Sequence, residues 1–455
     1  MPTEPLRSID RGLLPVGTPS SLPIRSLVDT TTPAARTALW SLPAWRHTLL
    51  ATGLTLALAA CGGSGGESGD GERLGLDSAD TAELQTHDRM KAGPTQSGQR
   101  RPGAQSTGTS SQPAATAAAS NHPRWTLTSP AEASRFLAQA SYGSSPKDIK
   151  ALTGRTANEW IEAQFSRPPT SLLNTMRYWQ QRSGKAITLT DAHNAWWYST
   201  VQQDQLRQRV AFALSQIFVV STNGDVSHFP KGIASYYDML ARNAFGNFRQ
   251  LLEDVTLHPM MGVYLTHIGN HKERFDSTGK LTQAPDENYA REVMQLFTIG
   301  LEQLNLDGTP KKDAQGRPIP TYSNNDVIGL ARVFTGWSWN GGRLTHECFF
   351  RAGYCAENTN ERETRPMVAY DQYHSTLEKR FLGTTIAEGQ SRTTADLKVA
   401  LDTLFNHPNV GPFIGRQLIQ RLVTSNPSPA YVRRVASAFN NNGQGVRGDM
   451  KAVIR

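Results

Sequence analysis

The sequence predicts an all-α fold: a large multi-helix domain with one irregular, disulfide-containing loop region, preceded by a disordered tether. Two observations predict the helices. Ser and Thr capping residues precede segments with a 3.6-residue apolar period, and the period-2 alternation typical of strands is scarce. A third observation predicts the tether, because residues 62–124 are dominated by small and polar residues and contain no Phe, Trp or Tyr.

The predicted helices follow one another from Trp125 onward. Ser129, Pro130 and Glu132 form a capping box, and Thr156 with Glu159 repeats it ahead of the next apolar segment. A long apolar-rich stretch spans residues 191–220. Further helices are predicted at residues 233–242, 248–257, 286–299, 323–334, 394–406, 410–423 and 429–440, with a hairpin in the irregular region 337–381.

The chain therefore divides into three predicted parts. Residues 1–60 are a leader with a lipoprotein-type signal peptide, residues 61–124 are a flexible spacer, and residues 125–455 are the helical domain. The segment after Gly448 resembles the start of a helix, so we expect the domain to continue beyond Arg455. Residues 1–44 are unusual ahead of a signal peptide, which predicts a misassigned translation start.

The export signal is the most specific motif. A twelve-residue apolar run from Leu49 to Ala60 follows Arg46 and His47, which suits a signal peptide and is too short to cross a bilayer. It ends in Leu-Ala-Ala-Cys at Cys61, which resembles a bacterial lipobox. Acylation of Cys61, with palmitate among the chains, would anchor the exported protein to the periplasmic face of the envelope. The residue after this cysteine is Gly62 rather than Asp, which resembles lipoproteins that are sorted to the outer membrane.

The charge of the chain indicates which classes of binding partner are favoured. The formal net charge is +8, and residues 131–455 carry thirty-six Lys and Arg against twenty-nine Asp and Glu. This mild basicity favours anionic phospholipid or polyanionic saccharide. Because no block of five or six like charges occurs, we predict no nucleic-acid partner.

Two cysteines remain besides Cys61. In an oxidising periplasm two neighbouring thiols usually pair, so Cys348 and Cys355 are predicted to close a small disulfide loop. A metal site with His346 is the alternative, although its ligands are few and no C-x-x-C is present.

The densest polar cluster lies between residues 286 and 300. At 100° per residue one face of a helix is apolar, formed by Tyr289, Val293, Leu296 and Phe297. The other face gathers polar side chains, namely Glu287, Asn288, Arg291, Glu292 and Gln295. Glu287 and Arg291 stand four residues apart and can pair. A solvated face would be structural, whereas a buried one would suit general acid/base catalysis or sugar binding.

Three histidines are weak candidates for metal ligands. His267 and His271 have helical i,i+4 spacing, but Gly269 lies between them and the glutamate of H-E-x-x-H is absent. His374 lies in a predicted loop near Asp371, where a lone histidine is usually solvated. The sequence leaves the cofactor unknown.

Trp337 and Trp339 are candidates for sugar binding. Exposed tryptophans stack on sugar rings, whereas buried ones fill a core, and the sequence favours the second interpretation.

Several of these segments together resemble the bacterial "domain of unknown function 1800" proteins. The resemblance is carried by residues 206–218, 286–300 and 326–337 and by the His407-Pro408 segment, and it extends from about Ser129 to Arg455. It implies an exported, mostly helical protein and little about activity. It also implies a neighbouring exported sulfatase-like protein as a partner. Phe297 stands where many relatives have His, so no catalytic role for that His transfers to this chain.

Three functions follow as hypotheses. The first is a lipid-anchored protein that binds or assembles a cell-surface or extracellular polymer, with Cys61 contacting the membrane. The second is a secreted hydrolase that uses Glu287 and Glu292, with Asn288 and Arg291 beside them and with or without a metal. The third is a non-enzymatic scaffold.

Overall fold

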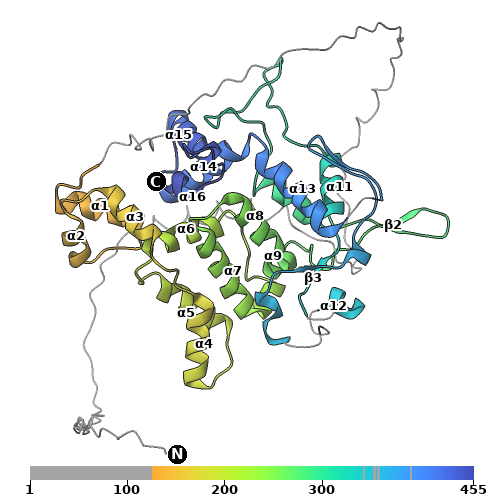
Figure 1. Cartoon of the computed structure of the whole chain (residues 1–455), viewed down its shortest axis with the longest axis horizontal. Helices are drawn as coiled ribbons and strands as arrows, with labels where there is room; N and C mark the ends of the chain where they lie inside the picture. Colours follow the sequence, from red (N-terminus) through yellow and green to blue (C-terminus); the bar gives the residue numbers. More distant parts are fainter. Residues whose placement is uncertain (1–124, 342–343, 352–354, 356–358, 390–391) are drawn as a thin grey trace, which may run out of the picture. The chain divides into compact units, whose positions relative to one another are not determined.

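The computed structural model describes residues 125–341, 344–351, 355, 359–389 and 392–455, all within one compact unit of the chain. The regular secondary structure of this part is mostly helical, which confirms the predicted all-α fold (Figure 1). The predicted leader, the tether and Cys61 lie outside the described residues. Within these ranges no helix combines the length and the apolar character needed to cross a bilayer.

Helices from the first half of the domain form its N-terminal side and its centre. In chain order these are α1 (Pro130–Ala140), α2 (Pro146–Leu152), α3 (Ala157–Phe165), α4 (Leu172–Ser183), α5 (Leu189–Ser199), α6 (Gln205–Ser215), the 3-10 turn η1 (Asp225–His228), α7 (Pro230–Asn243), α8 (Phe248–Leu257) and α9 (Pro259–Tyr264). Both predicted capping boxes are present: Ser129 accepts from the amide of Glu132, and Thr156 accepts from that of Glu159.

The second half adds α10 (Asn288–Gln295), α11 (Asn324–Val333), the short α12 (His346–Phe350), the 3-10 turns η3 (Thr359–Thr364) and η4 (Asp371–Tyr373), α13 (Thr393–Asn406), α14 (Val410–Leu422), α15 (Pro429–Asn440) and α16 (Met450–Ile454). One continuous hydrophobic core joins α4 to α16, and its largest fully buried rings include Tyr289, Phe248 and Phe297.

Three two-stranded antiparallel pairs interrupt the helices. They are β1 (Arg274–Phe275) with β2 (Leu281–Gln283), β3 (Trp337–Ser338) with β4 (Val368–Ala369), and β5 (Lys379–Phe381) with β6 (Thr384–Ile386). β5 packs on α11, where the backbone of Gly329 passes so close to Arg380 that an added Cβ would lie 1.9 Å from the Arg380 carbonyl oxygen.

Three details differ from the sequence prediction. The apolar-rich stretch 191–220 is divided between two helices, α5 and α6, because the hydroxyls of Ser199 and Thr200 donate to carbonyl groups of the preceding turn at the end of α5. Helix α4 was not predicted. His267 and His271 do not lie on a helix, since α9 ends at Tyr264 and Thr266 and Gly269 adopt positive φ angles of 59° and 72°.

Candidate functional site

Helices α4 and α5 form an antiparallel helical hairpin, drawn in yellow in Figure 1, that is fixed at its base by buried carboxylates. Asp238 of α7 accepts hydrogen bonds from the Ser171 hydroxyl at 2.6 Å and the Leu172 amide at 2.7 Å, so it caps the start of α4. Asp204 accepts from the amide and hydroxyl of Thr170, at 2.8 and 2.7 Å. These bonds orient α4 on the core.

A groove of about 600 Å³ lies between the two helices. Its apolar walls come from Met176, Trp179 and Ile187, and its polar lining comes from Gln180, Ser183, Lys185, Thr188, Asp191 and Asn194. The Asp191 carboxylate is already engaged, because it accepts from the amide and hydroxyl of Thr188 at 2.8 and 2.7 Å.

Three other polar groups of the groove are open to a ligand. The side chains of Gln180, Lys185 and Asn194 form no hydrogen bond or ion pair with any residue that the structure describes. Lys185 and Asn194 are exposed, and Gln180 is half-buried. Two amides and an ammonium therefore stand along one hollow, where they can donate to and accept from hydroxyl or carboxylate groups.

Exposed aromatic rings lie on the same two helices as the groove. Trp197, Tyr178 and Tyr198 are 65%, 55% and 46% exposed, which is unusual for such large side chains. The Tyr198 ring lies 6.0 Å from Trp179 in the groove wall, in an edge-to-face arrangement. Sequence reasoning missed this site, because Trp197 was considered only as part of the apolar-rich stretch 191–220 and α4 was not predicted.

The predicted polar cluster of α10 is divided by the fold. The apolar stripe is confirmed at Tyr289, Val293 and Phe297, which are all buried. Glu287 and Arg291 form the expected ion pair at 3.1 Å, with both side chains more than a third exposed. The backbone N–H of Asn288 donates to the Asp286 carboxylate at the start of the helix. This half of the cluster is an ordinary solvated face.

Glu292 is different, because it is buried at 7% exposure. Its Oε2 has no hydrogen-bond partner among the described residues. Burial raises the pKa of this carboxyl, and the nearby Arg291 guanidinium offsets only part of the effect. A carboxyl group with a raised pKa holds its proton closer to neutral pH, as a general acid requires.

The three candidate histidines are already engaged by backbone groups. The Nε2 atom of His267 lies 2.9 Å from the Thr256 carbonyl oxygen, and its ring stacks on that of Tyr289 with 4.0 Å between the centroids. Burial lowers the pKa of His267 to about 4. His271 Nδ1 lies 2.6 Å from the Lys272 carbonyl oxygen. Among the described residues no three His, Cys, Asp or Glu side chains are arranged to hold a metal ion.

His374 belongs to a buried ionic cluster that the sequence did not reveal. The Asp396 carboxylate lies 3.0 Å from His374 Nε2 and 2.9 Å from Lys379 Nζ, and all three side chains are less than 5% exposed. Beside it Glu273 accepts from Arg332 at 2.7 Å and from Ser375 at 2.8 Å. The cluster joins α11, α13 and β5 and is internally well paired.

The irregular region contains the predicted disulfide. Cys348 and Cys355 are bonded, with both residues fully buried. Trp337 and Trp339 are 4% and 5% exposed, and Trp339 packs 5.5 Å from Phe229. Both tryptophans are core residues, the interpretation that the sequence favoured, and they offer no open ring face for a sugar.

Fold and site together define an all-α domain with one internal disulfide and a helical hairpin that presents an aromatic groove. The model of the family described as "Protein of unknown function (DUF1800)" matches residues 135–455, so the chain belongs to this family. No curated protein and no solved structure matches the chain.

Proposed function

We propose that this protein is a lipid-anchored, exported protein of the bacterial envelope that binds a cell-surface or extracellular polysaccharide in the groove between α4 and α5. The observation that carries the proposal is a groove with an aromatic wall at Trp179 and unengaged amide groups, on a hairpin that also exposes the rings of Tyr178, Trp197 and Tyr198. Binding sites of this kind combine apolar or aromatic walls with a few convergent polar groups.

The chemistry of the groove suits a sugar chain. Aromatic rings supply large contact areas with few rotatable bonds, so ordering them costs little conformational entropy. The amides of Gln180 and Asn194 match hydroxyl groups, and Lys185 favours saccharides that carry carboxylate or sulfate. Such a charged polymer is also the substrate that a neighbouring sulfatase-like partner would modify.

Export and anchoring support the same proposal. A disulfide between Cys348 and Cys355 fits an oxidising compartment outside the cytoplasm. The lipobox-like sequence before Cys61 supplies the anchor. If Cys61→Ser is expressed in a bacterial host, the protein should leave the membrane fraction and lose metabolic labelling by palmitate. Membrane retention of this variant would contradict the anchor without affecting the groove.

The binding function is tested by affinity electrophoresis through gels that contain neutral or anionic polysaccharides. The double variant Trp179→Ala/Trp197→Ala should lose at least tenfold in affinity, or about 1.4 kcal/mol. Phe275→Ala is the matched control, because Phe275 is also an exposed aromatic residue, with 52% of its surface exposed, but lies on β1 and not on the hairpin. Equal retardation of the double variant and the wild type would refute the proposal.

A hydrolase is the second candidate, and the unpartnered, buried carboxyl of Glu292 favours it. In this case Glu292 donates a proton to the leaving group, while Glu287, Asn288 and Arg291 line the neighbouring helix face. Release of reducing ends from a bound polysaccharide is the assay. Glu292→Gln should abolish it, and Glu388→Gln, at an exposed position, should not. A wild-type protein that binds without cleaving leaves only the first proposal.

A further inference from the structure

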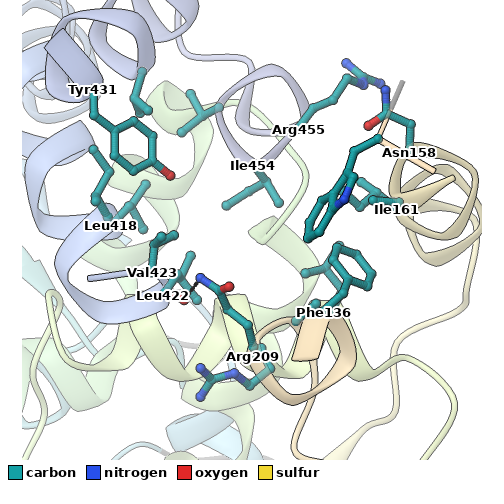
Figure 2. A pocket seen from close by; sticks show the side chains of 18 residues that line it. Phe136, Asn158, Ile161, Arg209, Leu418, Leu422, Val423, Tyr431, Ile454 and Arg455 are labelled. Carbon is teal, nitrogen blue, oxygen red and sulfur yellow. Dashed lines mark hydrogen bonds between the residues drawn. The ribbon is translucent and has the colours of Figure 1, made fainter. Parts of the chain in front are cut away.

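A second hollow lies away from the α4–α5 hairpin, among helices from both ends of the domain. This apolar groove of about 460 Å³ is bounded by α1, α3, α6, α14, α15 and α16 (Figure 2). Its walls are apolar, formed largely by aliphatic side chains together with the rings of Trp125 and Phe136; the aliphatic members include Ile161, Leu206, Leu418, Leu422, Val423 and Ile454. Its volume falls in the range of about 300 to 1,000 Å³ that is usual for small-molecule sites.

Arg209 lies at one edge of the apolar groove. Its guanidinium is 5.4 Å from the centroid of the Tyr142 ring, so the cation rests on an aromatic face. No ion pair or hydrogen bond joins this guanidinium to any described residue, and its Nε is buried without a partner. A half-buried cation that lacks a counterion is costly unless an anion binds to it.

Another polar group faces the same space. Figure 2 shows the Tyr431 hydroxyl directed into the groove, and burial raises the pKa of this phenol, so it remains a neutral hydrogen-bond donor. Arg455, also in the lining, is already paired with Glu162 at 2.6 Å. Arg209 is therefore the cation of this lining that remains available to a ligand.

From this geometry we propose that the apolar groove binds the chain of a long-chain fatty acid whose carboxylate pairs with Arg209. The apolar walls match an alkyl chain, because each methylene that they remove from water adds to the favourable free energy of binding. The guanidinium matches a carboxylate, which it can bind through two parallel hydrogen bonds. Charge complementarity selects the acid over a neutral lipid. This site is independent of the polysaccharide groove.

The proposal is tested with the full chain and two probes, palmitate and the uncharged hexadecanol, by equilibrium binding in detergent-free buffer. We expect one palmitate per chain and weaker binding of hexadecanol. Arg209→Gln should reduce palmitate affinity at least tenfold and remove the preference for palmitate. Arg182→Gln is the matched control, because Arg182 also lies over a tyrosine, Tyr178, at 5.8 Å but stands on the hairpin; it should bind palmitate like the wild type.

A second variant tests the walls separately. Leu418→Trp should fill the apolar groove and abolish binding of both probes. Because Leu418 is buried, the circular-dichroism melting curves of Leu418→Trp and of Arg209→Gln should both match that of the wild type as evidence of folding. Three results would overturn the proposal: no palmitate binding by the wild type, equal palmitate affinity of Arg209→Gln and the wild type, or binding of anionic phospholipid vesicles in place of the free acid. A change of oligomeric state in Leu418→Trp would instead assign the surface to a second copy of the chain.

Discussion

Asp396→Ala should be one of the most destabilising single substitutions in this domain. The variant removes the carboxylate that lies 2.9 Å from Lys379 Nζ, at a lysine whose side chain is fully buried. Breaking a buried ion pair by removing one partner costs about 3 to 5 kcal/mol, because the other charge stays buried without compensation. Since whole domains are stable by about 5 to 15 kcal/mol, this loss is a large fraction of the total.

Urea unfolding at pH 7, followed by tryptophan fluorescence, measures this loss. The double variant Asp396→Leu/Lys379→Met should recover much of it, because it removes both charges at once. A loss below about 1 kcal/mol for Asp396→Ala, or a double variant no more stable than the single one, would show that the pair does not hold α13 on β5.

The pH dependence of this loss has a defined sign. Burial alone would raise the pKa of Asp396, but hydrogen bonds from His374 and Lys379 outweigh it, and the net pKa lies below the ordinary value of 3.8. The stabilisation by this carboxylate is therefore complete above pH 3.8 and disappears as the pH falls through the folded-state value. Wild type and Asp396→Ala should converge in stability in acid.

Three further predictions use the same unfolding measurement. Glu292→Gln should stabilise the domain by about 1 to 3 kcal/mol at pH 7, because it removes a charge that burial disfavours, and the gain should vanish below pH 4.5, where the carboxyl is protonated in both states; a constant gain across this range would contradict the assignment. The double variant Cys348→Ser/Cys355→Ser should lose about 2 to 3 kcal/mol, as expected for a loop closed over seven positions, and reducing agent should affect only the wild type. Gly329→Ala should be destabilised by overpacking against Arg380, about 1 to 3 kcal/mol, despite the higher helix propensity of alanine; a more stable variant would disprove the close contact.

Features that depend on near neighbours in sequence were predictable. The capping boxes at Ser129 and Thr156 are complete within four residues, so the residue types alone specify them. Cys348 and Cys355 are close enough in the chain to pair with little loop entropy. The buried stripe through Tyr289 follows from helical periodicity.

Features that depend on packing between distant segments were not predictable. Helical periodicity placed Glu292 on the polar face, yet the surrounding elements cover that side of α10. Asp396 and Lys379 are seventeen positions apart and meet only because α13 packs beside β5. The α4–α5 groove was missed for a related reason: α4 lacks the complete capping box that predicted α1 and α3, and its start is capped in part by Asp238 from α7.

The attachment of the α4–α5 hairpin to the rest of the domain has an evolutionary consequence. Asp204 and Asp238 hold the start of α4, while Tyr178, Trp197 and Tyr198 remain exposed on the surface of the two helices. Mutations along the outer faces of α4 and α5 can therefore accumulate without disturbing the domain beneath. A family with this architecture can keep one scaffold and diversify what it recognises, much as antibody frameworks do with their loops.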